Sequence, residues 1–212
     1  MSGEELAEEV TALREGLDAR TNALLDDFDC MRFLRARQMN VPKAIAMAAE
    51  WGTWANEVLP GSRTGRTPLN ILDDIEDPDE EVYTSKAHCP HALCGEDKEG
   101  RPIYWEQTGK CGVQYRELRK YVDNDVLFAR HVRIQQLMLC RMRATMERTG
   151  QRVEKLVVVN DLSHLQMSPD MDAIRYFIGI IGIDQKFFPE RLQTVFCINT
   201  VCSAQTMPIR CI

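Results

Sequence analysis

The first part of the chain carries apolar residues at helical intervals. Leu24, Phe28 and Met31 recur every three or four residues, which is the spacing of one helix face. Asn40 is typical of a helix N-cap and Pro42 of a first helical turn, so a further helix is expected to begin there. The pattern predicts a bundle of helices.

A change of composition follows this helical part. Residues 61–82 are predicted to be a linker, because Gly, Pro, Thr and Asp are frequent there. The linker would separate a helical bundle at 1–60 from a second domain at 83–212.

The second part alternates between short apolar runs and longer helical patterns. Strands are expected at 103–106, 156–159 and 194–198, and one long helix at 115–148 with Gly150 as its stop. A last helix would follow Ser168 as its N-cap. Its expected buried face consists of Ile174, Phe177, Ile178 and Ile181. This order predicts an α/β fold with a mainly parallel sheet flanked by helices.

Composition and charge narrow the class of protein. The 212 residues are 44% hydrophobic and 27% charged, with a formal net charge of -6. This is the balance of a globular protein, and its sign does not favour nucleic acid as a partner. No apolar run approaches the roughly 18 residues that span a bilayer. We therefore expect a cytoplasmic protein.

The eight cysteines are expected to be reduced. Cys30 and Cys140 lie in helical patterns and Cys197 in an apolar run, whereas disulfide-rich secreted domains place cysteines in loops. The acidic segment 1–10 also lacks the features of a secretory signal.

Two groups of residues could carry chemistry, and both have simpler interpretations. The segment 88–94 holds two histidines and two cysteines, but a structural zinc site needs a second ligand pair at a defined spacing. Asp161, Ser163 and His164 are the residue types of a hydrolase triad, yet no Gly-x-Ser-x-Gly elbow is present. We expect no metal, no cofactor and no enzymatic activity.

Four strings, in order, resemble the CRAL-TRIO family of lipid-binding and lipid-transfer proteins. They are DFDCMRFLRAR (27–37), DKEGRPIYWEQTGK (97–110), VVVNDLSHL (157–165) and FFPERLQTVFCIN (187–199). The resemblance implies a helical N-terminal bundle and a lobe in which a sheet forms the floor of an apolar pocket closed by a mobile helix.

The implied function is capture of one phospholipid or other hydrophobic ligand, of phosphoinositide type, and its exchange at membranes. Burial of an acyl chain contributes roughly 0.8 kcal/mol per methylene. Association with membranes would be peripheral and transient. The alternative is a regulatory module that binds a membrane or a protein without transferring lipid.

The resemblance also implies site residues. Arg37 and Glu190, together with Arg191, would hold the lipid headgroup; the simpler interpretation is that Arg37 closes its helix and Glu190 pairs with Arg191. Leu156 and Val158 stand where choline-lipid binders carry small hydroxyl residues, which argues against that headgroup. The implied pocket lining consists of Tyr104, Leu156, Val158, Phe177, Ile178, Ile181, Phe196 and Ile198.

The end of the chain departs from the family. The segment after Asn199 does not resemble the helices and strands that follow this strand in family members. The resemblance therefore implies a C-terminally truncated lobe with an incomplete pocket, which would bind lipid weakly or aggregate.

Overall fold

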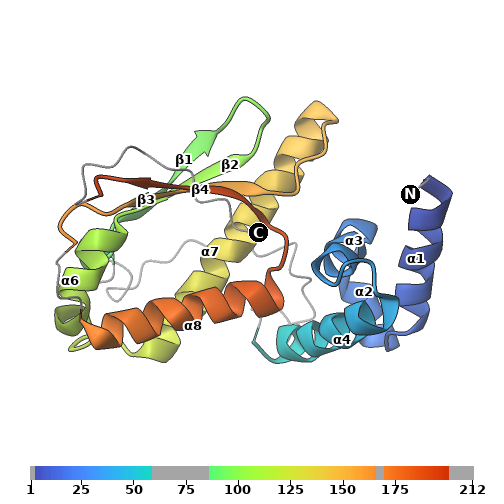
Figure 1. Ribbon diagram of the computed structural model, residues 1–212, viewed down its shortest axis with the longest axis horizontal. Helices are drawn as coiled ribbons and strands as arrows, with labels where there is room; N and C mark the ends of the chain where they lie inside the picture. Colours follow the sequence, from blue (N-terminus) through green and yellow to red (C-terminus); the bar gives the residue numbers. More distant parts are fainter. Residues whose placement is uncertain (1–2, 59–85, 166–169, 201–212) are drawn as a thin grey trace. The chain divides into compact units, whose positions relative to one another are not determined.

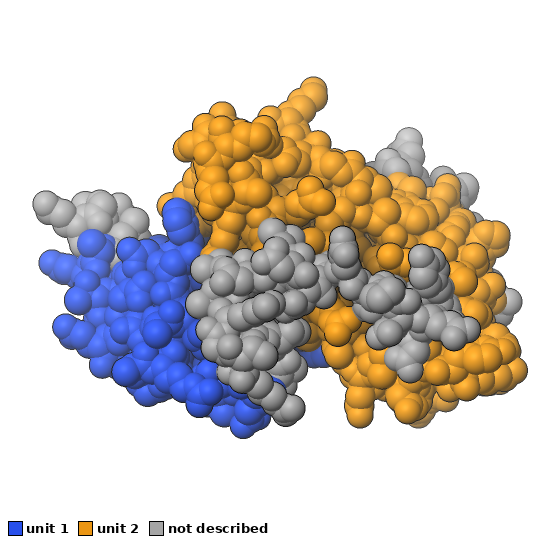
Figure 2. All heavy atoms as spheres, turned by 180° about the vertical axis from the view of Figure 1, so that it is seen from behind, with its two compact units in different colours: residues 1–73, 183–190 blue, residues 74–182, 191–212 orange. Residues whose placement is uncertain are grey.

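The structure is a computed structural model, and it divides the chain into two compact units. It describes residues 3–58, 86–165 and 170–200. Unit 1 comprises residues 1–73 and 183–190, and unit 2 comprises residues 74–182 and 191–212 (Figure 2). The predicted linker at 61–82 lies outside the described residues, so that domain boundary stays a prediction.

The N-terminal part of unit 1 is helical, as predicted (Figure 1). Its helices are α1 (Gly3–Glu15), α2 (Ala19–Leu24), α3 (Asp27–Ala36) and α4 (Val41–Val58). Asp18 and Asp26 cap α2 and α3, and the predicted N-cap Asn40 accepts the backbone N–H of Lys43 at 3.1 Å. The buried core of this part includes Leu13, Cys30, Phe33, Leu34, Ala44, Met47, Ala48 and Trp51.

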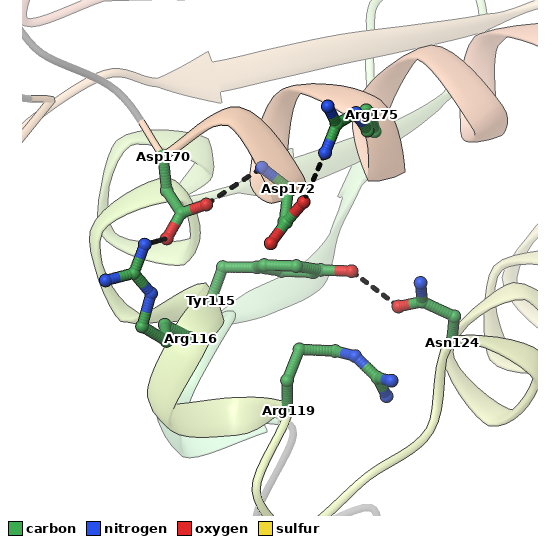
Figure 3. A pocket seen from close by; sticks show the side chains of 7 residues that line it. All are labelled: Tyr115, Arg116, Arg119, Asn124, Asp170, Asp172 and Arg175. Carbon is green, nitrogen blue, oxygen red and sulfur yellow. Dashed lines mark hydrogen bonds and ion pairs between the residues drawn. The ribbon is translucent and has the colours of Figure 1, made fainter.

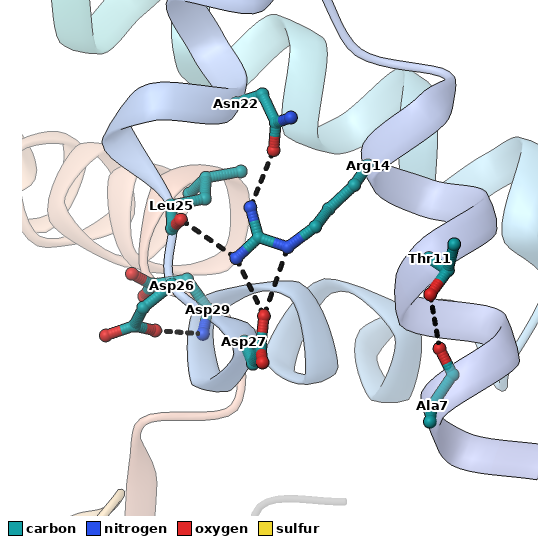
Figure 4. A network of polar contacts seen from close by, with 8 residues as sticks. All are labelled: Ala7, Thr11, Arg14, Asn22, Leu25, Asp26, Asp27 and Asp29. Carbon is teal, nitrogen blue, oxygen red and sulfur yellow. Dashed lines mark hydrogen bonds and ion pairs between the residues drawn. The ribbon is translucent and has the colours of Figure 1, made fainter. Parts of the chain in front are cut away.

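One arginine ties α1 to the segment between α2 and α3 (Figure 4). Its guanidinium, on Arg14, donates to the Asn22 side chain at 2.6 Å and to the Leu25 carbonyl at 3.1 Å. The same group forms an ion pair with Asp27 at 2.8 Å. Because a guanidinium is a rigid fork of donors, these contacts fix the turn that starts α3.

Unit 2 contains a four-stranded sheet in the order β1-β2-β3-β4. The strands are β1 (His91–Glu96), β2 (Pro102–Glu106), β3 (Leu156–Asp161) and β4 (Leu192–Ile198). β2, β3 and β4 are parallel, which confirms the predicted mainly parallel sheet, and β1 pairs antiparallel with β2. β1 was not predicted, because a segment rich in His, Cys and Gly lacks the β-branched and aromatic residues that favour strands.

The helices of unit 2 are α6 (Thr108–Leu118), α7 (Asn124–Thr149) and most of α8 (Met171–Phe187). The prediction of one unbroken helix at 115–148 is wrong. α6 ends at Leu118, and Val122 in the turn that follows packs in the same buried cluster as Leu118. Gly150 ends α7 in the left-handed conformation, as predicted. Ser168 lies outside the described residues.

A disulfide corrects the expectation that all cysteines are reduced. Cys89 and Cys111 are bonded, and both are buried in one apolar cluster with Tyr115 and Leu118. Cys89 precedes β1 and Cys111 lies in α6, so only the folded chain brings the two sulfurs together. Sequence spacing carries no signal for such a pair.

The sheet is unevenly covered. Tyr104 and Leu156 pack against Met138 and Met142 of α7 in one core cluster, and Figure 1 shows α7 and α8 on the same side of the sheet. The expected buried face of α8 is only partly correct. Its Phe177 packs against the core, but Ile178 and Ile181 keep 62% and 53% of their surface exposed. Among the described residues, no helix has the length and apolar character to span a bilayer.

Candidate functional site

The first candidate headgroup residue, Arg37, is the C-cap of α3. Its side chain is exposed, and its guanidinium donates to the neighbouring Ala36 carbonyl at 3.2 Å. The two following residues, Gln38 and Met39, have φ values of 52° and 61°. Left-handed backbone is unusual for residues with a side chain, and it makes the tight turn that leaves Arg37 at the surface.

The second candidate, Glu190, belongs to the same compact unit as Arg37. Its side chain is exposed, and its φ of 61° is again left-handed. The chain reaches this residue through the last turn of α8 and Pro189, and Pro189 is buried. In the structure Glu190 therefore ends a turn at the surface.

The turn before Glu190 is held by the N-terminal helices. Trp54 of α4 stacks on Phe187 with ring centroids 4.1 Å apart, and it meets Phe188 edge-on at 5.7 Å. Arg32 of α3 donates to the Pro189 carbonyl at 3.3 Å. Sequence reasoning missed Arg32 and Trp54, since no local pattern shows which distant segment a buried side chain will contact.

The third candidate, Arg191, is placed differently. It belongs to unit 2 and is only 5% exposed, whereas Glu190 belongs to unit 1. Its charge acts on the Cys140 thiol of α7, where it opposes the increase in pKa that burial causes. Its backbone carbonyl accepts the N–H of Leu156 at 2.8 Å and so joins the start of β4 to β3.

The predicted lining residues fall into two groups. Tyr104, Leu156 and Val158 come together on the face of the sheet that α7 covers. Phe177 packs in the separate cluster around the disulfide. The remaining four, which are half-buried or exposed, are Ile178, Ile181, Phe196 and Ile198.

A polar cluster that the sequence did not predict lies beside Tyr104. The Tyr104 hydroxyl donates to Glu106 at 3.1 Å. Arg130 of α7 contacts the ring nitrogens of His91 at 2.6 and 2.9 Å, and His91 Nδ1 lies 2.9 Å from the Cys89 carbonyl. In the Nδ1–H tautomer, Nδ1 donates to the Cys89 carbonyl and Nε2 accepts from the guanidinium at 2.9 Å, so the 2.6 Å contact of the guanidinium with Nδ1 is not a hydrogen bond.

Burial sets the protonation states of this cluster. It lowers the pKa of His91 to about 4, with a further contribution from the Arg130 charge. Burial also raises the pKa of Tyr104, and the nearby Glu106 carboxylate adds to that increase. Tyr176 of α8 shifts in the same direction for the same two reasons. At neutral pH the cluster therefore contains a neutral imidazole and two neutral phenols.

A polar pocket of about 260 Å³ lies elsewhere in unit 2 (Figure 3). Its lining comes from α6, α7 and α8 and consists of Tyr115, Arg116, Arg119, Asn124, Asp170, Asp172 and Arg175. The charges are largely paired within the pocket: Arg116 with Asp170 at 3.1 Å, and Arg175 with Asp172 at 2.6 Å. None of the predicted site residues contributes to it.

The residues of the hydrolase alternative form a turn. Asp161 accepts from the Ser163 backbone N–H and from the Asn199 side chain, each at 2.9 Å. The Ser163 hydroxyl accepts from Gln107 at 2.8 Å, and His164 is exposed with φ of 70°. These contacts join the ends of β3 and β4. Within the described ranges, no group of three or more potential metal ligands is found.

Comparison with known proteins identifies the family. The sequence profile of the CRAL/TRIO domain matches residues 88–207, which is more than half of the chain. This chain belongs to the CRAL/TRIO domain family. The match begins just before β1 and includes the whole described sheet of unit 2.

Several CRAL/TRIO relatives are similar over most of this chain. The CRAL-TRIO domain-containing protein YKL091C of Saccharomyces cerevisiae is 27% identical over 86% of the chain and 57% of its own length. The SEC14 cytosolic factor of Candida glabrata is 29% identical over 82% and 54%. The phosphatidylinositol/phosphatidylcholine transfer protein SFH4 of Arabidopsis thaliana is 28% identical over 82% and 27%.

A solved structure supports the CRAL/TRIO fold. The crystal structure of Sfh5 superposes with a TM-score of 0.53 at 16% identity, covering 82% of this chain and 55% of that chain. At this identity the likeness concerns the fold alone. The chain spans about half the length of the first two relatives named above, 57% and 54%.

Proposed function

We propose that this chain is a lipid-binding module of a lipid-transfer protein, and that it holds one phospholipid of phosphoinositide type. The observation that carries the proposal is the CRAL/TRIO match over residues 88–207, together with a relative named as a phosphatidylinositol/phosphatidylcholine transfer protein. The protein would act in the cytoplasm and touch membranes only while it loads or releases its ligand.

The headgroup would be held by Arg37 and Glu190. A guanidinium binds phosphate oxygens through parallel N–H donors, and a carboxylate accepts hydrogen bonds from the hydroxyls of an inositol ring. Both side chains are exposed at turns of the same compact unit, so both are available to a ligand. Arg191 follows Glu190 in sequence but is buried, and its carbonyl accepts the N–H of Leu156. These two observations support a role for Arg191 in fixing the start of β4.

The acyl chains would occupy the apolar part of unit 2. Tyr104, Leu156 and Val158 lie in the apolar cluster between the sheet and α7, Phe177 and Ile178 lie on α8, and the acyl chains would insert among these residues. Each methylene removed from water contributes roughly 0.8 kcal/mol, so even a partly enclosed chain supplies substantial binding free energy.

Lipid extracted from the purified chain provides the test. The chain would be incubated with vesicles of equimolar phosphatidylinositol and phosphatidylcholine, re-isolated, and its bound lipid identified by mass spectrometry. We expect one lipid per chain with phosphatidylinositol enriched. Arg37→Ala should reduce the amount of bound phospholipid about tenfold, the loss expected for a charge-assisted hydrogen bond, and it should affect both lipids because both carry a phosphate.

Arg20→Ala is the matched control, because Arg20 is an exposed arginine on α2 of the same unit. It removes the same charge and should leave the amount of bound phospholipid unchanged. Absence of bound lipid from the unmodified chain would contradict the proposal. Equal losses from both variants would show a general charge effect and would remove Arg37 from the site.

A regulatory module that binds membranes without transferring lipid is the second candidate. The exposed apolar residues Met171, Ile178 and Ile181 of α8 favour it, since such residues can insert into a bilayer interface. Vesicle co-sedimentation combined with a vesicle-to-vesicle transfer assay distinguishes the two candidates. Association without transfer supports the regulatory module, and transfer supports the first proposal.

A further inference from the structure

The aromatic and proline residues before Glu190 pack into the N-terminal helices of unit 1. Residues 183–190 belong to that unit although more than a hundred residues separate them from α4. Trp54 lies flat on Phe187, with an angle of 9° between the rings, and perpendicular to Phe188. Lys186 also pairs with Glu50 of α4. The end of α8 is thus held on two adjacent turns of α4.

A second contact holds the backbone at the turn itself. Arg32 is 6% exposed, and its Nη2 pairs with Asp29 at 2.9 Å while its Nη1 donates to the Pro189 carbonyl at 3.3 Å. The Asp29 carboxylate therefore orients the guanidinium toward the turn. The planar fork of an arginine suits this double role, because its donors point in fixed directions.

This carbonyl has a direct influence on Glu190. It belongs to the peptide group that precedes Glu190, and rotation of that group about the N–Cα bond of Glu190 is the φ angle. A hydrogen bond that fixes the carbonyl therefore restrains φ. The observed value of 61° is unfavourable for a residue with a side chain, so surrounding contacts must maintain it.

We propose that Arg32 and Trp54 are positioning residues for lipid headgroup recognition, acting through the turn that carries Glu190. The aromatic stack fixes Phe187 and Phe188, and the guanidinium fixes the next peptide group. The Glu190 carboxylate is then presented in one orientation to a headgroup with ring hydroxyls, within the unit that also carries Arg37. This inference rests on the proposed function, because it assumes that Glu190 contacts the headgroup.

The consequence is a specific effect on selectivity. Loss of the Arg32 contact would let the turn relax and would move the carboxylate, while the apolar surface of unit 2 would be unchanged. Binding of inositol lipid should fall relative to binding of other phospholipids. Uptake of lipid as such should persist, since acyl chains supply most of the binding free energy.

The test compares Arg32→Lys, Glu190→Gln and the double variant in the equimolar vesicle assay. Lysine keeps the positive charge beside Asp29 but has no second donor in a fixed direction for the Pro189 carbonyl. We expect each single variant to lower the ratio of bound phosphatidylinositol to phosphatidylcholine about tenfold, the effect of one charge-assisted hydrogen bond. The double variant should be no lower than Glu190→Gln alone, because both changes remove the same contact.

Arg35→Lys is the matched control on the same helix, and it should leave the ratio unchanged. Trp54→Leu should lower the ratio without altering the helical circular dichroism signal, and it serves as the test if Arg32→Lys fails to fold. The proposal is overturned if Arg32→Lys leaves the ratio unchanged while Glu190→Gln lowers it, if the two effects multiply, or if both lipids are lost equally. An unchanged ratio in Glu190→Gln overturns instead the headgroup role of Glu190 in the proposed function.

Discussion

One phenylalanine of each compact unit shows how differently a side chain of the same type can be buried in this protein. In unit 1 the side chain of Phe33 is fully buried between helices, with an exposed fraction of 0%. In unit 2 Phe196 lies on β4, at one end of the strand order, and is 45% exposed. Phe33 therefore contributes more hydrophobic free energy to folding than Phe196 does.

The difference follows from how each unit closes its core. Helices of the N-terminal part each present an apolar face to the others, and Met31 of the predicted face is buried. Phe28 of that face is 43% exposed, so periodicity alone does not identify every buried residue. A strand is buried only where neighbouring strands and a covering helix supply contacts. β3 lies between β2 and β4, and half of its residues are buried. In the described part of the sheet β4 pairs with β3 on one side, and its residues are half-buried or exposed.

The largest expected effect comes from a matched pair of phenylalanine-to-alanine substitutions, one in each unit. Phe33→Ala should lower the free energy of unfolding by about 3–5 kcal/mol, because it leaves a cavity in a closed core. Phe196→Ala should cost less than about 1.5 kcal/mol, since its side chain is half exposed and leaves no closed cavity. Urea denaturation followed by circular dichroism measures both. Equal losses would show that Phe196 is packed as firmly as Phe33.

The disulfide provides a test that should affect unit 2 alone. Cys89 and Cys111 are 22 residues apart in sequence, and a crosslink closing a loop of this size restrains the unfolded chain by about 3 kcal/mol. Reduction with dithiothreitol should lower the stability of the sheet by this amount. Hydrogen exchange measured by mass spectrometry should show faster exchange in β1 and α6 but not in α3.

The paired substitution Cys89→Ala and Cys111→Ala is the control for this experiment. It should show the same lowered protection without reductant and no further change when dithiothreitol is added. Faster exchange throughout unit 1 after reduction would contradict a local effect.

The smallest expected effect concerns pH and His91. Its pKa is lowered from 6.5 to about 4 in the folded protein, so below pH 6.5 the unfolded chain binds a proton that the folded chain excludes. Neutral His91 therefore makes its full contribution to the free energy of unfolding above pH 6.5, and this contribution is lost as the pH falls toward 4. We expect unit 2 to lose about 1–2 kcal/mol over this interval, less than the full shift because the site is partly screened by solvent.

His91→Gln is the variant that isolates this effect, because an amide can donate to the Cys89 carbonyl and accept from Arg130 without titrating. Denaturation midpoints measured between pH 7 and 4 should fall less steeply for His91→Gln than for the unmodified chain. Parallel slopes would show that other groups determine the acid sensitivity of unit 2.

Most of the elements could be predicted from local sequence. The apolar run at β3, the cap at Asn40 and the stop at Gly150 each act over a few residues, and the structure confirms them. β1 was missed because its residues have low strand propensity and its pairing with β2 is a tertiary choice. The break between α6 and α7 was missed because the helical pattern continues through 119–123, while the packing of Val122 in the cluster is visible only in the tertiary structure.

The residues of the candidate site also fall into those that local sequence identifies and those that only tertiary contacts identify. Arg37 and Glu190 were named from short motifs and stay predictions; the motif 187–199 includes the turn at Glu190, whereas the turn after Arg37 lies beyond the motif 27–37. Arg32 could not be assigned a role, because the contact that matters joins it to Pro189 across 157 residues. The cluster of His91, Glu106 and Arg130 also combines a strand pair with a helix that packs on it.

The sequence by itself determined the helical first part, the α/β order of the second and the membership of the CRAL/TRIO family. These properties depend on periodicity and on motifs that act locally or are read in order along the chain. The tertiary structure alone decided that Cys89 meets Cys111, that Trp54 receives Phe187 and that Phe196 remains half exposed. Such contacts join residues far apart in sequence, and no local pattern specifies which partners the packed chain will bring together.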